Sequence, residues 1–232
     1  MKKHILSILS IVLTAVAANA QTTDYELKVN DFFELKVVDP VDVVYRYHPD
    51  SVGMATFRTD AAHASGILFQ QSDKKLTIEL SPEAPRTGLP VVTVYSTSLI
   101  KAENGGAGKL TVVRPQRVPK FKAKLIGNGR MQVEGVEAQS VEASIATGNG
   151  TLIVSGKCDI ASLSNTGSGQ LQADELQARQ IKASMWGTGS IGCNPAESLS
   201  VTGAGSGKVY YLGQPAVKNR SLAVKALPLN AK

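Results

Sequence analysis

Histidine, cysteine and tryptophan are scarce in this sequence. It has three histidines, two cysteines and one tryptophan in 232 residues, and aromatic residues make up 5%. The two histidines beyond the N-terminal segment and the two thiols show no spacing that metal ligands require. The sequence therefore predicts no metal site and no cofactor.

A strong excess of charge is also absent. The formal net charge is +6, and it falls to +4 when Lys2 and Lys3 are removed with the N-terminal segment. So small an excess, spread along the chain, does not indicate a nucleic-acid partner. Apolar residues make up 43% of the chain, which is enough for a sizeable core.

The apolar run near the N-terminus is too short to cross a bilayer comfortably. It extends from Ile5 to Ala18, after the basic start Met1-Lys2-Lys3-His4, and it leads into Ala18-Asn19-Ala20, a small-any-small cleavage pattern. These features predict a signal peptide over 1–20 and an exported mature chain, 21–232, without a transmembrane segment. No cysteine lies near the cleavage point, so we expect no lipid attachment there.

Glycine, by contrast, is present in a regular pattern. A glycine–any–glycine triplet returns six times between residues 105 and 207, and the steps between successive first glycines are 21, 21, 19, 20 and 18 residues. A period of about 20 residues is typical of stacked repeat architectures. The six triplets begin at Gly106, Gly127, Gly148, Gly167, Gly187 and Gly205.

The residues after each triplet alternate in polarity. The first is polar and the second apolar in all six repeats, and the fourth is mostly apolar, which predicts a half-buried strand after each bend. Glycine reaches backbone angles closed to other residues, and stacked corners favour positions without side chains, so we interpret the triplets as corners. The sequence thus predicts an all-β fold, a parallel β-helix with coils about 4.8 Å apart. An antiparallel barrel or sandwich is the alternative.

The segments on either side of the regular repeat are less regular. Residues 25–95 alternate β-rich runs with turn signals, and no run keeps helical spacing for ten residues, so we expect little helix. Regular coils are predicted over 96–212, and a C-terminal cap or tail over 213–232. Whether 25–95 continues the same β-helix is left open. Strands are expected near 32–38, 41–47, 55–59, 66–70, 75–80 and 90–95.

The order of these segments resembles the head GIN domain family. A leader is followed by Phe32-Phe33-Glu34-Leu35-Lys36-Val37, by Lys75-Leu76-Thr77-Ile78 and by serial Gly-x-Gly coils, so the resemblance covers about 25–211. Members are described as autotransporter-type adhesins of unknown function, many of them from Bacteroidetes. The resemblance implies a right-handed β-helix in the periplasm or at the cell surface of a Gram-negative bacterium, and it implies no catalytic residues.

The triplets do not match phosphate-binding loops. None has the third glycine of the dinucleotide fingerprint in place, and Val209 follows Gly207-Lys208 where a phosphate loop has serine or threonine. Turn glycines are therefore the better interpretation of all six.

Acidic residues are too scattered in the repeat to indicate catalysis. A glycan-cleaving β-helix needs paired carboxylates, or a base with Ca²⁺-binding carboxylates, whereas Asp174-Glu175 is the one adjacent acidic pair between residues 105 and 211. We therefore predict an exported, non-enzymatic β-helix that serves the cell envelope as an adhesin or binding module. A pectinase-like enzyme and a purely structural component are the alternatives.

Four residues are candidates for contact with a ligand, a glycan or another envelope protein. Lys109, Arg130 and Lys208 share the polar first position and would face outward together, towards anionic glycan or lipid head groups, or form a merely solvated face. Trp186 directly precedes the corner at Gly187. Exposed, it could stack on a sugar ring, but tryptophan is on average highly buried, so we expect it to pack at the corner.

The two cysteines are expected to stay unpaired. Cys193 falls in the apolar fourth position of its coil, whereas Cys158 lies two coils away at a different phase of the turn. Two coils are about 9.6 Å along the axis, and a disulfide requires alpha carbons within about 7 Å.

Overall fold

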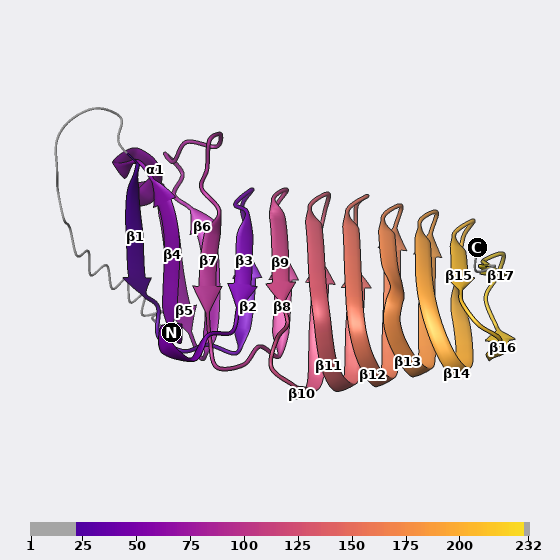
Figure 1. Cartoon of the computed structure of the whole chain (residues 1–232). Helices are drawn as coiled ribbons and strands as arrows, with labels where there is room; N and C mark the ends of the chain where they lie inside the picture. Colours follow the sequence, from indigo (N-terminus) through magenta and orange to yellow (C-terminus); the bar gives the residue numbers. More distant parts are fainter. Residues whose placement is uncertain (1–21, 230–232) are drawn as a thin grey trace, which may run out of the picture.

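The computed structural model describes residues 22–229. Strand accounts for 63% and helix for 4% of the structure, which is a β-solenoid of about six turns. Figure 1 shows the strands side by side in one row, from the N-terminal end at the left to the C-terminal end at the right. The predicted all-β fold with stacked parallel coils is confirmed. The predicted signal peptide, 1–20, lies outside the described residues.

Each regular coil crosses two sheet faces and two corners. The long strands bend around one corner without a break, and a Gly-x-Gly triplet forms the other (Figure 1). The first half of each long strand pairs along what we call the short face, and the second half pairs along the long face. The strands of this region are β8 (Lys101–Asn104), β9 (Lys109–Val113), β10 (Val118–Leu125), β11 (Arg130–Ile145), β12 (Thr151–Gly167), β13 (Gln170–Gly187), β14 (Ser190–Ala204) and β15 (Lys208–Tyr211).

Apolar side chains at the second position of each coil form a column inside the solenoid. Parallel, in-register pairing places them directly above one another. Because side chains alternate between the two sides of a strand, the polar first-position residues face solvent and the second-position residues face the core. All six core residues are fully buried: Leu110, Met131, Leu152, Leu171, Ile191 and Val209.

The two glycines of the second triplet, Gly127 and Gly129, serve different needs. Gly127 has a φ of 90°, in the left-handed region that favours glycine, and a Cβ there would meet nothing within 4 Å. Gly129 faces the preceding corner, where a Cβ would lie 2.2 Å from the carbonyl oxygen of Gly106. The first glycines of the later triplets are crowded as well, because a Cβ there would come within 2.6 Å of a carbonyl oxygen of the preceding corner: Gly148, Gly167, Gly187 and Gly205. The corners therefore stack closely because both triplet positions lack side chains.

The early segment continues the solenoid, but out of sequence order. Strands β2 (Glu34–Val37) and β3 (Val43–Arg46) lie between the coil of β6 (Lys75–Leu80) and β7 (Val92–Tyr95) and the coil of β8 and β9 (Figure 1). All four of these pairings are parallel. Residues 34–46 and 75–95 therefore add two coils to the same stack.

Antiparallel strands close the N-terminal end. The short face ends with β4 against β7 and β1 against β4, and the long face ends with β5 against β6. Tyr25, Phe57 and Phe69 stack in series between these strands, with ring centroids 5.3 and 6.0 Å apart. The elements of this end are β1 (Thr23–Lys28), a 3₁₀ turn (Pro49–Ser51), β4 (Met54–Thr59), α1 (Ala61–Gly66) and β5 (Ile67–Ser72).

The C-terminal end carries one further coil. Strand β16 (Ala216–Asn219) pairs with β14, and β17 (Lys225–Pro228) pairs with β15, both in parallel. Its corner has no glycine triplet, and the side-chain amide of Asn219 spans it by donating to the Val224 carbonyl at 3.0 Å. In the described part of the chain, no helix is long and apolar enough to cross a membrane.

Candidate binding surfaces

The three predicted basic residues share one outward column of the short face, but they do not form a continuous stripe. Arg130 pairs with Lys109 on the neighbouring strand β9, and Lys208 pairs with Lys225 on the neighbouring strand β17. Three neutral residues separate the two pairs in the column, namely Thr151, Gln170 and Ser190. The column therefore presents two basic pairs about four strand spacings apart, roughly 19 Å.

Trp186 is exposed, so the expectation that it packs at the corner is wrong. Its side chain is 52% exposed, whereas the preceding Met185 is fully buried. The alternation of the strand forces this arrangement, because a residue next to an inward side chain must face outward. Its neighbours on the adjacent strands are the small residues Thr166 and Ala204, which leave the indole ring open.

Small hydroxyl residues cover the long face beside Trp186. One outward column runs Ser144, Ser164, Ser184, Thr202 without interruption. Two parallel columns add further serines, interrupted by Ile160, Gln180 and Lys182. We call this surface the hydroxyl face, and its residues are Ser140, Ser144, Ser162, Ser164, Ser184, Ser198, Ser200 and Thr202.

The same long face is charged nearer the N-terminal end, where opposite charges neutralise each other. Lys101 bonds Glu34 at 3.1 Å, and Glu103 lies between Lys36 and Lys124 at 3.5 and 3.8 Å. Strand β10 contributes two more lysines, Lys120 and Lys122, which both contact Glu142 and lower the pKa of its carboxyl. The long face thus passes from a charge-paired half to a largely uncharged half of hydroxyls.

The two cysteines are unpaired, as predicted. Cys193 is fully buried in the short-face column, and Cys158 is half-buried on the long face. Burial, with Asp159 beside one thiol and Asp174 near the other, raises the pKa of Cys158 to about 11 and of Cys193 to about 12. Both thiols are therefore protonated and poor nucleophiles at neutral pH. Over residues 22–229, no three histidine, cysteine or acidic side chains are grouped as metal ligands would be.

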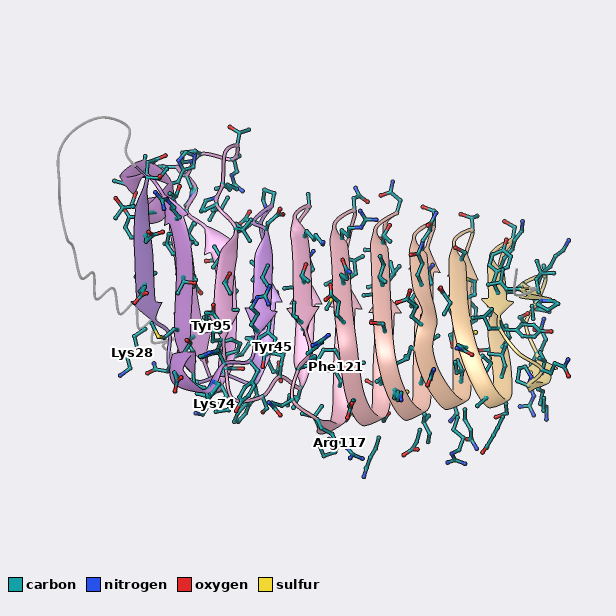
Figure 2. The ribbon with its side chains drawn as sticks, viewed as in Figure 1. Lys28, Tyr45, Lys74, Tyr95, Arg117 and Phe121 are labelled. Carbon is teal, nitrogen blue, oxygen red and sulfur yellow. The ribbon has the colours of Figure 1, made fainter. Side chains whose placement is uncertain are left out.

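A cavity of about 350 Å³ opens at the N-terminal end, between β1, α1 and β5. Leu27, Val29, Ile67 and Phe69 contribute apolar walls, and Lys28, Asp31, Asp73 and Lys74 contribute polar groups to the lining. Figure 2 shows Lys28 and Lys74 at the lower end of these strands. No pattern in the sequence indicated this cavity, because strands far apart in the chain form it.

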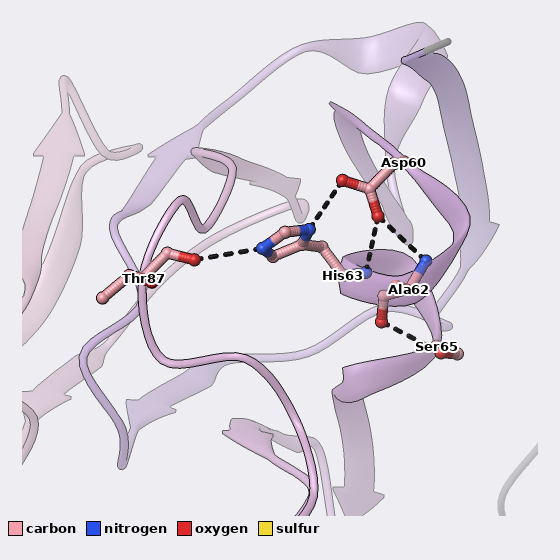
Figure 3. Close-up of polar contacts among 5 residues, drawn as sticks. All are labelled: Asp60, Ala62, His63, Ser65 and Thr87. Carbon is pink, nitrogen blue, oxygen red and sulfur yellow. Dashed lines mark hydrogen bonds and ion pairs between the residues drawn. The ribbon is translucent and has the colours of Figure 1, made fainter. Parts of the chain in front are cut away.

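One histidine, His63, links the connection 81–91 to α1 through hydrogen bonds, and we call this contact the clasp (Figure 3). Asp60 caps α1 by accepting from the backbone N–H groups of Ala62 and His63 at 2.9 and 3.0 Å. The two ring nitrogens of His63 lie 2.7 Å from an Asp60 carboxylate oxygen and 3.0 Å from the Thr87 carbonyl oxygen. Both partners are acceptors, so only the protonated imidazole can donate to both.

The clasp should therefore respond to pH. The Thr87 carbonyl, and then Asp60, raise the pKa of His63 above 6.5. A raised folded-state pKa means that the stabilisation is complete below pH 6.5 and is lost as the pH rises through the folded-state pKa. In an NMR titration we expect the His63 ring protons and the Gly88 amide to share one midpoint above 6.5, and Asp60→Asn to lower it. A midpoint at or below 6.5 in the wild type would contradict the clasp.

Comparison with known families identifies the architecture. The family model described as "Putative auto-transporter adhesin, head GIN domain" matches residues 31–215. The chain belongs to the head GIN domain family. The match begins just before β2 and ends just before β16. It therefore covers the coils whose strands form the short face and the long face. A comparison with curated proteins finds no match.

Solved structures share this fold at low sequence identity. A "putative adhesin" from Bacteroides fragilis superposes with a TM-score of 0.80 at 18% identity, covering 91% of this chain and 98% of that one. A "Putative lipid binding protein" from Parabacteroides distasonis gives 0.74 at 18% identity, with the same coverage. A "putative adhesin" from Parabacteroides merdae gives 0.71 at 20% identity, covering 93% and 99%. At such identities the likeness shows a shared fold.

Proposed function

We propose that this head GIN domain is an exported, non-enzymatic binding module of the cell envelope, which holds a glycan on its long face around Trp186. The single observation that carries the proposal is the exposed indole, 52% accessible, next to the uninterrupted column Ser144, Ser164, Ser184, Thr202. The N-terminal leader pattern and the adhesin descriptions of the family support export and an envelope role.

The geometry suits a pyranose ring. An indole has a large apolar surface, and one side of it is exposed to solvent in the free protein. When the apolar side of a sugar ring stacks on the indole, this surface is removed from water, which favours binding. The hydroxyls beside it both donate and accept hydrogen bonds, as sugar hydroxyls do. Because these side chains stand on a parallel sheet, their spacing is fixed before the ligand arrives, which reduces the entropy cost of binding.

The chemistry of this surface fits binding rather than catalysis. A serine or threonine nucleophile needs an adjacent base to activate it. The Ser184 and Thr202 hydroxyls instead bond each other at 3.1 Å, and Lys182 is the neighbouring charged group in the next column. We assign no catalytic role to any residue of the hydroxyl face.

The basic pairs are proposed as secondary contacts. Trp186 precedes its corner on the long face, and Lys208 follows the next corner on the short face. Lys109 and Arg130 lie at the equivalent place several coils away. If the glycan extends over the corners, its anionic groups would contact the amines of Lys109 and Lys208 and the guanidinium of Arg130.

Trp186→Ala should abolish most glycan binding without unfolding the protein. A stacked tryptophan at the centre of a binding site is typically a dominant contact, so we expect affinity to fall about tenfold or more. The measurement is a glycan-array screen of the purified protein followed by titration of the best glycan. Trp186→Phe should retain part of the affinity, and Ile160→Ala, which removes an exposed apolar side chain elsewhere on the long face, should retain all of it.

Two results would contradict the proposal. One is equal glycan binding by the wild type and Trp186→Ala. The other is that the wild type and Trp186→Ala both bind phospholipid vesicles and neither binds a glycan. In that case the binding surface would lie elsewhere, and the N-terminal cavity would be tested next.

A further inference from the structure

We propose a second binding site, for an acidic saccharide, in a groove on the short face that is separate from the hydroxyl face. The groove has a volume of about 760 Å³. It lies where β3, β7, β9 and β11 adjoin, in the charged N-terminal half of the solenoid. The charged and aromatic residues that line the groove are Arg46, Tyr47, His48, Tyr95, Arg114 and Glu134.

Parallel register builds the floor of the groove. Tyr95, Arg46, Val113 and Glu134 are direct partners on four neighbouring strands. Each is the outward member of its strand, because the residue before it is buried: Val94, Tyr45, Val112 and Val133. An aromatic ring, a guanidinium and a carboxylate therefore stand in one column at strand spacing, about 4.8 Å per step.

The two guanidinium groups of the groove have no ion-pair partner among residues 22–229. Elsewhere in that range, Arg58, Arg86 and Arg179 each contact a carboxylate, whereas Arg117, Arg130 and Arg220 are also without an ion-pair partner. Arg46 and Arg114 make no such contact, although Glu134 lines the same groove. Guanidinium forks bind carboxylate, sulfate and phosphate groups through paired hydrogen bonds, so the groove offers two such contacts to an incoming anion.

The backbone at Arg114 supports a ligand-binding role independently. Its φ is 43°, in the left-handed region that non-glycine residues seldom occupy. Its N–H donates a 2.9 Å hydrogen bond to the Glu134 carbonyl, and a Cβ on the neighbouring Gly135 would lie 3.3 Å from the Arg114 side chain. Glycine would fit this position without strain, yet the chain places a long cation there. Backbone strain of this kind clusters at functional sites, and among the five non-glycine residues of the described chain with a positive φ, Arg114 is the one that lines the groove.

The tyrosines indicate that the anion belongs to a sugar. Tyr47 is 40% exposed and directly follows Arg46 in the chain, and Tyr95 lies beside Arg46 in the column, so the groove presents aromatic surface next to this guanidinium. Glu134 supplies an acceptor for sugar hydroxyls. An inorganic anion would use the guanidinium groups alone, whereas a pyranose carrying a carboxylate, sulfate or phosphate would use all three kinds of group.

The test compares two arginines three residues apart. Arg114→Ala removes a groove cation, and Arg117→Ala removes an exposed cation from the same connection but outside the groove. Figure 2 shows Arg117 at the lower edge of the solenoid, apart from Tyr95. Arg114→Gly provides a third variant, because it removes the cation and also relieves the positive φ. The probes for calorimetric titration of the purified protein are tetragalacturonate, a sulfated heparin tetrasaccharide, neutral maltotetraose and sodium sulfate at matched ionic strength.

We expect at least one acidic tetrasaccharide to bind, with maltotetraose and sulfate at least tenfold weaker. Arg114→Ala and Arg114→Gly should each weaken that binding about tenfold or more, with the melting temperature of Arg114→Gly equal to or above that of the wild type. Arg117→Ala should change the affinity less than twofold, and the contribution of the hydroxyl face is measured separately with Trp186→Ala.

Three results would overturn the inference: no binding of either acidic probe, equal losses in Arg114→Ala and Arg117→Ala, or sulfate binding as tightly as the saccharide. Because Trp186→Ala is measured in the same series, failure here is separable from failure of the glycan site on the hydroxyl face.

Discussion

Replacing Gly129 by alanine is expected to lower the free energy of unfolding by about 3 kcal/mol. The new Cβ would lie 2.2 Å from the carbonyl oxygen of Gly106 and 3.0 Å from that of Gly108. Both obstacles are backbone atoms of the preceding corner, so no rotamer change can relieve the clash. The coils would have to separate, which would break the hydrogen bond from the Arg130 N–H to the Gly108 carbonyl.

Gly127→Ala, in the same triplet, is the matched control. Its φ of 90° is unfavourable for alanine, but a Cβ there meets nothing within 4 Å. We therefore expect only the conformational cost of the left-handed backbone, about 1 kcal/mol. Urea unfolding of both variants gives the comparison, with midpoints compared at unchanged m-values. Equal losses in the two variants would show that backbone angles, and not the stacking of corners, are why the triplets contain glycine.

Replacing Asn104 by leucine should be comparably harmful. The side chain is fully buried, and its amide donates to the carbonyls of Gly108 and Arg130 at 2.9 and 3.0 Å. Its oxygen accepts from the Gly106 N–H at 3.1 Å. Asn104→Leu leaves the Gly106 N–H without its acceptor and removes one donor from each of the Gly108 and Arg130 carbonyls, of which the Gly108 carbonyl keeps its bond from the Arg130 N–H. With about 1–3 kcal/mol for the unsatisfied N–H and about 1 kcal/mol for each further lost bond, the loss should be about 3 kcal/mol or more.

Asn165→Leu is the control for this second prediction. Asn165 is equally buried and donates to the carbonyls of Gly169 and Ser190, but its own oxygen has no hydrogen-bond partner. Its cross-strand neighbours are the buried apolar residues Ile145 and Met185. Leucine there removes an unsatisfied oxygen and gains apolar contact, so we expect a loss of only about 1 kcal/mol. A loss at Asn165 as large as that at Asn104 would contradict the assignment of these bonds as the source of stability.

The regular coils could be predicted from the sequence because each is defined by local residues. Gly127 and Gly129 mark a corner, and Arg130 followed by Met131 marks the polar and apolar sides of the next strand. The spacing then repeats, so one coil predicts the next. The same spacing correctly predicted that Cys193 lies inside the solenoid and forms no disulfide with Cys158.

The order of the N-terminal coils could not be predicted in this way. The insertion of β2 and β3 between later strands depends on pairings such as Glu34 with both Lys75 and Lys101, which no local pattern specifies. Strand β1 was missed although it is as long as predicted strands such as β4, and its one pairing is with that distant strand. Helix α1 was missed because six residues are too few to show helical periodicity. The Asp60 cap was the one available signal for α1.

The candidate sites also differ in whether local sequence or the pairing of distant segments determines them. The exposure of Trp186 could have been inferred from the strand alternation that buries Met185, because the two are adjacent. The Arg114 groove had no such signal, since its lining comes from the separate segments 46–51, 95, 113–114 and 134. The basic column of Lys109, Arg130 and Lys208 was predicted correctly as a column, but its gap of neutral residues shows only when the coils between them are aligned.

The most direct test of the binding account uses the fluorescence of the protein itself. Trp186 is the single tryptophan of the chain, so its emission reports on this surface and on no other. Titration with the glycan selected on the array should give a saturable blue shift and protect the indole from acrylamide quenching, with a midpoint equal to the calorimetric Kd. Saturable glycan binding that leaves both the emission and the quenching of Trp186 unchanged would contradict the claim that this residue holds the ligand.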